Sequence, residues 1–214
     1  MKNRWKEEVL LLKDQVAIVT GASRGIGKEI SRKLAEAGMK LTIVGSSTDI
    51  TKAAEELRSQ GFSYVMAVQA DVTKEEDVKG IVEKTIAEYG QVDILVNNAG
   101  IGFFKLTEEV SLEEWKKVFE VNVNGVFLGS KAVLPHMKER KSGTIITISS
   151  DVARYTIPNG AAYTATKYAV QGFSGSLAQE VREYGIRVGT INPGMVDTFF
   201  ADSTQGLPEK KDWL

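Results

Sequence analysis

The sequence predicts an α/β protein in which helices cover both faces of a parallel sheet, the doubly wound architecture, as a single domain of residues 1–214. Two observations support this prediction. Six short apolar runs rich in β-branched residues alternate with segments of helix length, and such alternation requires parallel crossover connections. The chain of 214 residues is also long enough to bury one full core, and it shows no linker, repeat or low-complexity segment.

The expected elements follow in a regular order. Residues 1–13 form a short polar arm, and the first strand is expected at residues 15–20, where a β-branched run ends at Gly21. The first helix is expected at residues 28–37, because Gly38 stops the helical pattern. By the same signals, the other strands are expected at residues 40–44, 64–69, 92–96, 144–149 and 186–191, and the other helices at residues 49–60, 74–89, 111–140 and 161–184.

The composition excludes several classes of function. The net charge is −1, with basic and acidic residues interleaved, which gives no electrostatic basis for binding nucleic acid or an anionic membrane. The absence of cysteine excludes disulfides and thiolate metal sites, and the single histidine, His136, excludes a multi-histidine site. We therefore expect no metal, and we read His136 as a helix-end residue. No apolar run near the N-terminus has the length of a signal peptide core or a membrane span, which predicts a cytoplasmic protein.

Polar and glycine-rich segments follow five of the six predicted strands. Residues 21–27 follow the first strand, Asp71 the third, residues 97–100 the fourth, Ser150 the fifth and residues 192–194 the sixth. Because the carboxyl ends of parallel strands meet at one edge of a sheet, these segments predict a single ligand site at that edge.

The first of these segments carries Gly21, Gly25 and Gly27 between a strand and a helix. Glycines without a Cβ allow backbone N–H groups and a helix N-terminus to approach a pyrophosphate closely. A plain strand–helix turn is the alternative interpretation. The phosphate-binding pattern of nucleoside triphosphatases is excluded, because Glu29 follows Lys28 where that pattern needs serine or threonine.

Tyr163 and Lys167 are four residues apart in a predicted helix, so their side chains share one face. None of the other five tyrosines has a lysine four residues later. A phenol titrates at a pH of about 10 in water, and an adjacent ammonium group favours the phenolate. We therefore expect Lys167 to lower the pKa of Tyr163 towards the range of efficient acid–base catalysis. Ser150 follows the strand at 144–149 and is placed to supply a hydroxyl to the same site.

Taken together, these motifs resemble the classical short-chain dehydrogenase/reductase family, and the resemblance extends from about Leu12 to Thr198. It rests on Thr20-Gly21-x-x-x-Gly25-Ile26-Gly27, Asn97-Asn98-Ala99-Gly100, Asn122, Ser150, Tyr163-x-x-x-Lys167 and Asn192-Pro193-Gly194, in this order. The resemblance implies a Rossmann-type fold, a nicotinamide cofactor and an oxidoreductase that transfers a hydride between that cofactor and a carbonyl or secondary alcohol. A non-catalytic dinucleotide-binding regulator on the same fold is the alternative.

The resemblance also implies a catalytic set of four residues. Tyr163 would be the general acid in carbonyl reduction and the general base in alcohol oxidation. Lys167 would lower the pKa of Tyr163 and hold the nicotinamide ribose, and Ser150 would orient the substrate oxygen. Asn122 matches the family's helix-bending asparagine, which holds a water for proton relay, although a buried residue satisfying the local backbone is a second reading.

The residues after the second predicted strand favour NADPH over NADH. An NAD site usually has a carboxylate there to accept a hydrogen bond from the ribose, but residues 45–47 read Gly-Ser-Ser. Arg24, Ser46 and Ser47 supply the cation and hydroxyl donors that a 2′-phosphate requires, and Asp49 is assigned to the start of the next helix. The residues expected to bind the cofactor are Gly21, Ser23, Arg24, Gly25, Ile26, Gly27, Ser46, Ser47, Asp71, Val72, Asn98, Ala99, Gly100, Tyr163, Lys167, Pro193, Gly194, Val196 and Thr198.

The substrate is specified less closely. Apolar loop residues near the site predict a mainly apolar pocket; they are Phe103, Phe104, Val152, Ile157, Phe199 and Phe200. Arg154 is a weaker candidate to bind an anionic group of the substrate. The resemblance implies a small carbonyl or alcohol substrate, with a carrier-bound 3-oxoacyl chain as one candidate.

Two further expectations concern assembly and the end of the chain. Small and apolar residues in the helices at 111–140 and 161–184 predict a homodimer or homotetramer, as in the family. Residues 199–214 resemble the start of the family's substrate loop, so we expect the family's last strand to be lacking and the sequence to be a fragment.

Overall fold

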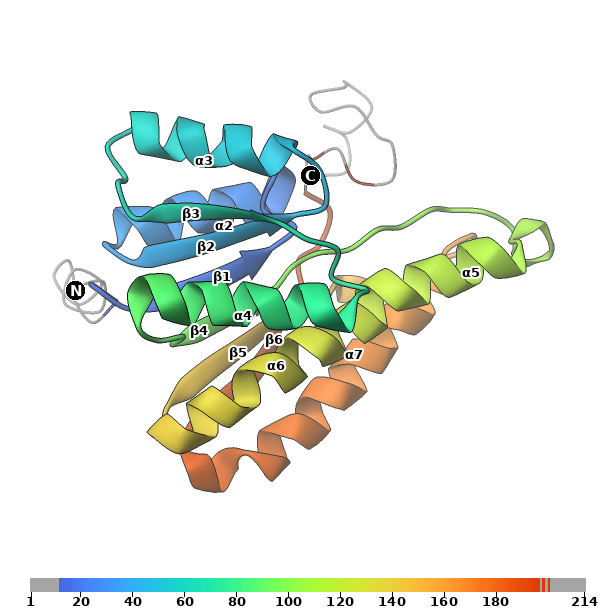
Figure 1. The fold of residues 1–214 in the computed structure, drawn as a ribbon. Coiled ribbons are helices and arrows are strands. Elements are labelled where there is room, and N and C mark those ends of the chain that lie inside the picture. Colours follow the sequence, from blue (N-terminus) through green and yellow to red (C-terminus); the bar gives the residue numbers. More distant parts are fainter. Residues whose placement is uncertain (1–11, 197, 199, 201–214) are drawn as a thin grey trace, which may run out of the picture.

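One sheet of six parallel strands forms the centre of the molecule in the computed structural model, which describes residues 12–196, 198 and 200 (Figure 1). The strand order is β3-β2-β1-β4-β5-β6, which confirms the doubly wound prediction and places the topological switch point between β1 and β4. The strands are β1 (Val16–Thr20), β2 (Lys40–Gly45), β3 (Val65–Gln69), β4 (Ile94–Asn97), β5 (Gly143–Ile148) and β6 (Ile186–Ile191).

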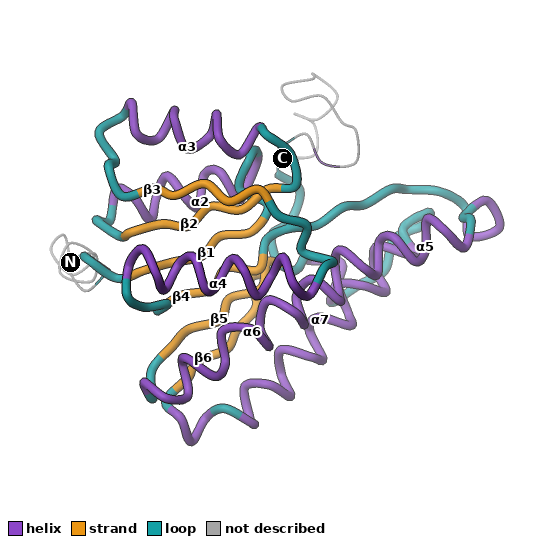
Figure 2. The backbone as a smooth tube through the Cα atoms, viewed as in Figure 1, coloured by secondary structure: helices purple, strands orange, loops and turns teal. Residues whose placement is uncertain are grey.

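Helices cover both faces of this sheet, so the strands lie between two helical layers (Figure 2). One face packs against α2 (Gly25–Glu36) and α3 (Asp49–Ser59). The other packs against α4 (Glu75–Tyr89), α6 (Gly125–Arg140) and α7 (Ala161–Glu180). Because side chains alternate across a strand, Ala17 and Val19 of β1 enter the first core and Ile18 enters the second. All five residues of β1 are buried, as the apolar run predicted.

The long helical stretch predicted at residues 111–140 is present, and a π-helical turn interrupts it. The structure divides it into α5 (Leu112–Phe119), a π-helical turn η2 (Glu120–Asn124) and α6. Such a turn inserts one extra residue into the helix, which local propensity does not signal. The helix predicted at 161–184 likewise ends early at Glu180, and the short turn η4 (Arg182–Tyr184) follows it. The remaining short helical turns are η1 (Thr107–Glu109) and η3 (Asp151–Ala153).

The other boundaries lie within three residues of those predicted, and α2 shows the largest shift because it begins at Gly25. β6 is the edge strand of the described sheet, and only Ile186 of its six residues is buried. Residues 1–11 of the predicted arm lie outside the described residues, as do residue 199 and residues 201–214 of the predicted substrate loop. Within the described part of the chain, every helix is too short or too polar to cross a membrane.

Candidate active site

A cleft of ≈ 1610 Å³ runs along the carboxyl edge of the sheet, where the predicted motifs converge. All of the residues predicted to bind the cofactor line it, from Gly21 to Thr198. Ser150, Tyr163 and Lys167 line it as well, whereas Asn122 does not. Every one of these segments therefore lies at the same edge of the sheet, as the direction of the parallel strands predicted.

The glycine loop follows the central strand β1 and lines the cleft. Gly21 and Gly25 have φ values of +65° and +57°, in the left-handed region that favours glycine. Gly27 is buried in the first turn of α2, where an added Cβ would lie 2.4 Å from both the Asn98 side-chain nitrogen and the Gly21 carbonyl oxygen. The backbone conformation thus explains Gly21 and Gly25, and the lack of space for a side chain explains Gly27.

A side chain without an assigned role at the sequence level holds this loop in place. The hydroxyl oxygen of Thr20 accepts hydrogen bonds from the backbone nitrogens of Asn98 and Ala99, both at 3.0 Å. In return, the Asn98 amide donates to the carbonyl oxygens of Thr20 and Gly21, at 2.9 and 3.1 Å. Thr20 precedes Gly21 in the motif, but only the pairing of β1 with β4 shows what its hydroxyl binds.

Both acidic and basic side chains lie beyond the end of β2. Asp49 begins α3, as predicted, and its carboxylate accepts from Lys52 at 3.1 Å and from the Ser47 hydroxyl at 3.1 Å. These two hydrogen bonds, together with the nearby charge of Arg24, hold the pKa of Asp49 below its usual value. Lys52 also lines the cleft, although the sequence analysis did not select it. Asp49 therefore has cations beside it, and Glu56 of the same helix is a second acid that lines the cleft.

Asp71 and Val72 follow β3, which lies at one edge of the sheet, and both line the cleft. The Asp71 carboxylate accepts from the backbone nitrogen and the hydroxyl of Thr73, at 3.0 and 2.8 Å, and these bonds lower its pKa. Val72 packs against Gly125, where an added Cβ would lie 3.0 Å from the valine side chain. The first turn of α6 thereby fixes the position of this loop.

The relation between Tyr163 and Lys167 differs from the prediction. Burial raises the pKa of Tyr163 to about 12, hydrogen bonding with Ser150 lowers it in part, and the charge of Asp151 raises it. Lys167 is buried, which lowers its own pKa to about 8, and its Nζ donates to the Ile148 carbonyl at 3.0 Å. Nζ lies 5.3 Å from the centroid of the Tyr163 ring. The expected lowering of the tyrosine pKa is wrong for the protein alone, because desolvation of the buried phenolate is the largest cause of the shift.

Asp151 is a site residue that the sequence analysis missed. It opens η3, lines the cleft and accepts a hydrogen bond from the Ser150 hydroxyl at 2.9 Å. Its other oxygen accepts from the hydroxyl of Tyr155, which also lines the cleft. An aspartate directly after Ser150 is visible in the sequence, but its direction depends on the turn that η3 makes.

Asn122 lies in the π-helical turn and is buried. Its side-chain oxygen accepts from the backbone nitrogen of Ile101 at 2.9 Å, and its amide donates to the Ile101 carbonyl at 2.8 Å and to Thr166 Oγ1 at 3.1 Å. Thr166 in turn donates to the carbonyl of Tyr163 at 2.7 Å. Asn122 therefore connects the segment after β4 to the helix that carries Tyr163 and Lys167, and the backbone groups that it satisfies, those of Ile101, are 21 residues away in the chain.

The sequence model of the short chain dehydrogenase family matches residues 15–206 of this chain. The chain belongs to this family. It is accordingly an NAD(P)-dependent oxidoreductase, and the family and fold predicted from the motifs are confirmed.

Three similar members of the family illustrate the likeness. A 3-oxoacyl-(acyl-carrier-protein) reductase of Chlamydia muridarum is 40% identical over 207 residues, which cover 95% of this chain and 82% of the relative. The structure of an alcohol dehydrogenase from the archaeon Thermococcus sibiricus, complexed with 5-hydroxy-NADP, has a TM-score of 0.86 at 38% identity and covers 92% of this chain and 83% of its own. The structure of a 3-ketoacyl-(acyl-carrier-protein) reductase from Brucella melitensis, complexed with NADH, has a TM-score of 0.85 at 35% identity, with coverage of 94% and 83%.

In this short-chain dehydrogenase, apolar side chains border the end of the cleft around Tyr163. The rings of Phe104 and Phe200 lie 6.3 and 5.2 Å from that of Tyr163, between centroids. Val152 and Ile157 complete this wall, so four of the six residues predicted for the apolar pocket line the cleft. Phe199 lies outside the described residues.

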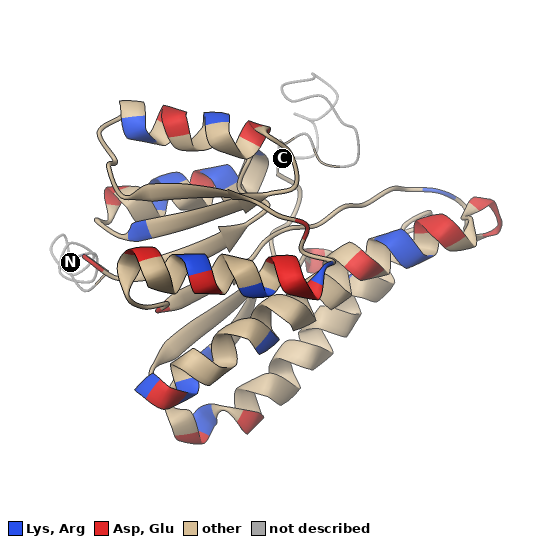
Figure 3. Ribbon diagram, in the orientation of Figure 1, with Lys and Arg blue, Asp and Glu red and all other residues tan. Residues whose placement is uncertain are grey.

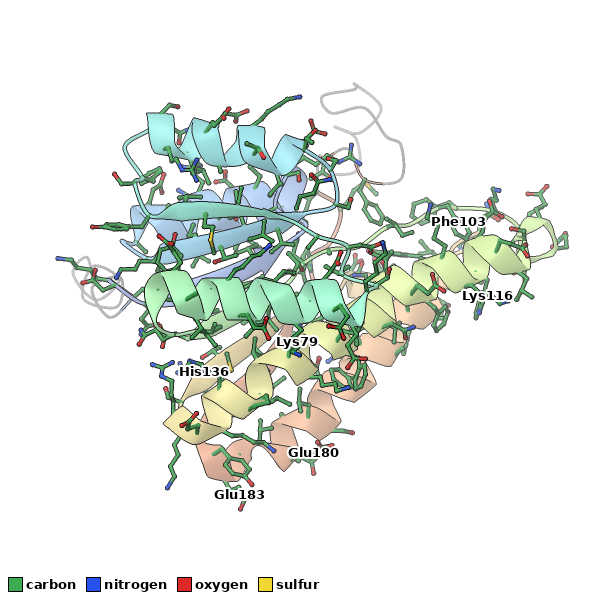
Figure 4. The ribbon with its side chains drawn as sticks, in the orientation of Figure 1. Lys79, Phe103, Lys116, His136, Glu180 and Glu183 are labelled. Carbon is green, nitrogen blue, oxygen red and sulfur yellow. The ribbon has the colours of Figure 1, made fainter. Side chains whose placement is uncertain are left out.

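Three other candidates lie away from the cleft. Phe103 packs instead beside Lys105, whose Nζ is 5.9 Å from its ring centroid, and Arg154 is exposed. His136 lies in α6 at the opposite end of the sheet from Phe103 (Figure 4). Its Nε2 accepts from the backbone nitrogen of Val92 at 3.2 Å, which is a structural contact.

Proposed function

We propose that this short-chain dehydrogenase reduces a ketone or aldehyde with NADPH, and that Tyr163 donates the proton to the carbonyl oxygen. The observation that carries the proposal is the cleft position of Tyr163, hydrogen-bonded to Ser150 and with a pKa raised to about 12. A phenol that keeps its proton at neutral pH is an acid, which is the form that carbonyl reduction needs.

The residues of the cleft fit a nicotinamide dinucleotide. An added Cβ on Gly25 would meet only Thr198, at 3.6 Å, so the backbone at this point faces the cleft and is open to a pyrophosphate. The cofactor, when bound, supplies or accepts the hydride. The chain's own residues then have to bind it, orient the carbonyl and move one proton.

Each residue near the reacting carbonyl has a role that follows from its contacts. Ser150 and Tyr163 converge on one point, so both can bind the substrate oxygen, and Tyr163 transfers its proton to it. Lys167 donates one of its three N–H groups to the Ile148 carbonyl, which leaves two for a ribose hydroxyl and the phenol. Asn122 acts through Thr166 by holding the helix that carries these groups.

The proposal is tested by replacing Tyr163 with phenylalanine, which removes the phenolic hydroxyl and with it the transferable proton, and keeps the ring. We expect a loss of turnover of about 10²–10⁴-fold with little change in NADPH affinity. Tyr64→Phe is the matched control, because Tyr64 is an exposed tyrosine outside the cleft. Turnover within a few-fold of wild type in the Tyr163 variant would refute the assignment. A wild-type protein that binds NADPH but reduces no member of a ketone and aldehyde panel would favour the non-catalytic alternative.

The preference for NADPH rests on the cations at the end of β2. Arg24, Ser46, Ser47 and Lys52 all line that part of the cleft. A 2′-phosphate binds well to donors such as Arg24, Ser46 and Lys52, whereas the Ser47 hydroxyl donates to Asp49. Asp49 opposes a phosphate, but it is already hydrogen-bonded to Lys52 and Ser47. The solved structures of relatives contain both kinds of cofactor, NADH in one and an NADP derivative in another.

The cofactor preference is tested with Arg24→Ala. A lost hydrogen bond to a charged group of about 1.5–3 kcal/mol predicts NADPH binding weakened by about 10- to 150-fold and NADH binding nearly unchanged. Lys28→Ala is the matched control, because Lys28 pairs with Glu56 and does not line the cleft. Equal losses for the two cofactors in the Arg24 variant would contradict a contact with the 2′-phosphate.

We also propose that the chain assembles through the helical layer of α6 and α7. Charged residues are sparse along α7, which contains only Lys167 and Glu180, whereas α3, α4 and α5 carry many (Figure 3). Phe127 of α6 and Tyr168 of α7 are 46% and 44% exposed, and such exposure of large apolar side chains is typical of an interface. Light scattering should show a homodimer or homotetramer at micromolar concentration, and Tyr168→Glu should shift it towards monomer. A monodisperse wild-type monomer would contradict the proposal.

A further inference from the structure

The cleft contains a carboxylate beside Ser150 that the proposed mechanism does not use. Asp151 lines the cleft, and its backbone nitrogen donates to the carbonyl of Pro193 at 2.9 Å. This bond fixes the main chain of Asp151 against the segment that follows β6. The side chain is half-buried and held by several hydrogen bonds, so its position is set by the fold.

The two oxygens of Asp151 differ in how fully they are used. Oδ1 accepts from the Ser150 hydroxyl at 2.9 Å and from the backbone nitrogen of Val152 at 2.8 Å. Oδ2 accepts from the Tyr155 hydroxyl, and a carboxylate oxygen can accept about two hydrogen bonds. Oδ2 therefore keeps one acceptor position, and the described residues give Asp151 no ion pair.

Space for a ligand group exists at this free acceptor. Oδ2 faces Gly194, where an added Cβ would lie 3.5 Å from it. Because glycine has no side chain, this side of the carboxylate remains open to the cleft, which Gly194 also lines.

The proton of Ser150 connects Asp151 to the reaction. A serine hydroxyl has one proton, and here it is donated to Asp151. The same proton cannot be donated to a substrate oxygen at the same time. When Ser150 turns its proton from Oδ1 to the substrate carbonyl, the carboxylate loses one hydrogen bond, and a substrate that donates to the free position on Oδ2 replaces it.

The short separation of Ser150 and Asp151 indicates where that donor lies on the substrate. In the proposed function the reacting oxygen contacts Ser150, and the Asp151 carboxylate is one hydrogen bond further along the same wall. A substituent on the carbon next to the carbonyl is likewise close to the reacting oxygen, so it can reach Asp151 while that oxygen contacts Ser150. The other lining residues near Tyr163 that come from these loops, Phe104, Val152 and Ile157, offer only apolar side chains.

We propose that Asp151 is a specificity-determining residue that selects ketones and aldehydes with a hydroxyl or ammonium group on the carbon next to the carbonyl. The inference rests on the proposed function, because it requires the carbonyl oxygen to bind at Ser150 and Tyr163. A substrate with an anionic or purely accepting group at that carbon brings no proton to share with Asp151 and is disfavoured. A 3-oxoacyl thioester, whose oxygens near the carbonyl only accept, belongs to the disfavoured group.

The test compares three small ketones as substrates with NADPH: hydroxyacetone, methoxyacetone and acetone. The methoxy compound keeps the electron-withdrawing oxygen but cannot donate, so it separates hydrogen bonding from intrinsic reactivity. We expect kcat/KM for hydroxyacetone to exceed both other values by about tenfold or more, which is the size of a hydrogen bond to a charged group. Asp151→Ala should reduce this preference to about one.

Two further variants control for charge and shape. Asp151→Asn keeps the size and one acceptor oxygen, so it should retain only part of the preference. Glu180→Gln removes the same charge at the exposed end of α7, far from the cleft, and should leave the preference unchanged (Figure 4).

The outcomes are distinct. A wild-type preference of about one, or a preference that persists in Asp151→Ala, would overturn the role of Asp151 while leaving the proposed function intact. The wild-type comparison needs no variant, so it decides the question even where a substitution at Asp151 prevents folding. Absence of NADPH-dependent reduction of any ketone or aldehyde would instead refute the proposed function, and this inference with it.

Discussion

Replacing Thr20 with valine should destabilise the protein by about 2–4 kcal/mol, although valine has almost the same shape. The hydroxyl oxygen of Thr20 accepts from two backbone nitrogens, those of Asn98 and Ala99, at 3.0 Å each, and its own proton points to the Val96 carbonyl at 3.4 Å. Thr20 is only 6% exposed. Each buried donor left without a partner costs about 1–3 kcal/mol, and no cavity forms because the volume is conserved. The two donors are part-buried, so we take the lower part of that range for each.

Urea unfolding monitored by circular dichroism measures this loss directly. Thr20→Ser is the matched control, because it keeps the hydroxyl and deletes one methyl group, and it should cost less than the valine substitution. NADPH affinity should also fall in the valine variant, since Asn98 and Ala99 line the cleft. A valine variant that loses less than about 1 kcal/mol, or less than the serine variant, would show that the hydroxyl does not hold the loop.

Three more predictions follow from the structure. The raised pKa of Tyr163, about 12, keeps the phenol protonated at neutral pH. Between pH 6 and 8, below the pKa of Lys167 at about 8, kcat/KM for alcohol oxidation should therefore rise by about tenfold per pH unit, while kcat/KM for carbonyl reduction stays nearly constant. An oxidation rate that does not change with pH would exclude Tyr163 as the base. Burial, and then the charge of Arg140, lower the pKa of His136, so the unfolded chain binds a proton at this histidine more readily than the folded chain. The free energy of unfolding should therefore fall as the pH drops below about 6.5. In urea titrations at several pH values, His136→Gln should lose that part of the pH dependence. Gly27→Ala should cost about 1–3 kcal/mol by overpacking, since the new Cβ would lie 2.4 Å from neighbouring atoms, whereas Gly172→Ala in α7 meets nothing within 4 Å and should be neutral or stabilising by thermal unfolding.

The location of the site could be predicted from the sequence for a physical reason. Apolar runs of β-branched residues mark buried strands, and the direction of parallel strands fixes which loops share an edge. The glycines at 21, 25 and 27, Ser150 and the Tyr163–Lys167 pair all follow or flank such runs, so their convergence needed no coordinates. The resemblance to the family then gave these residues their expected roles.

Other features depend on contacts between segments far apart in the chain. The π-helical turn at residues 120–124 lies where Asn122 binds Ile101, and Thr20 binds Asn98 across the β1–β4 pairing. The direction of the Asp151 carboxylate depends on the turn η3. No local pattern of residue types contains these contacts, because hydrogen-bond partners are determined by position in space.

By itself, the sequence determined the alternation of strands and helices, the edge at which the motifs meet, and the family. Only the tertiary structure decided the protonation of the candidate acid. The sequence places an ammonium group one helical turn from Tyr163, which predicts a lowered pKa, yet the pKa is raised to about 12. A pKa depends on how much water the whole surrounding fold removes from the group as well as on its nearest charge. That desolvation is contributed by side chains such as Phe104 and Phe200, which only the folded chain brings against the Tyr163 ring.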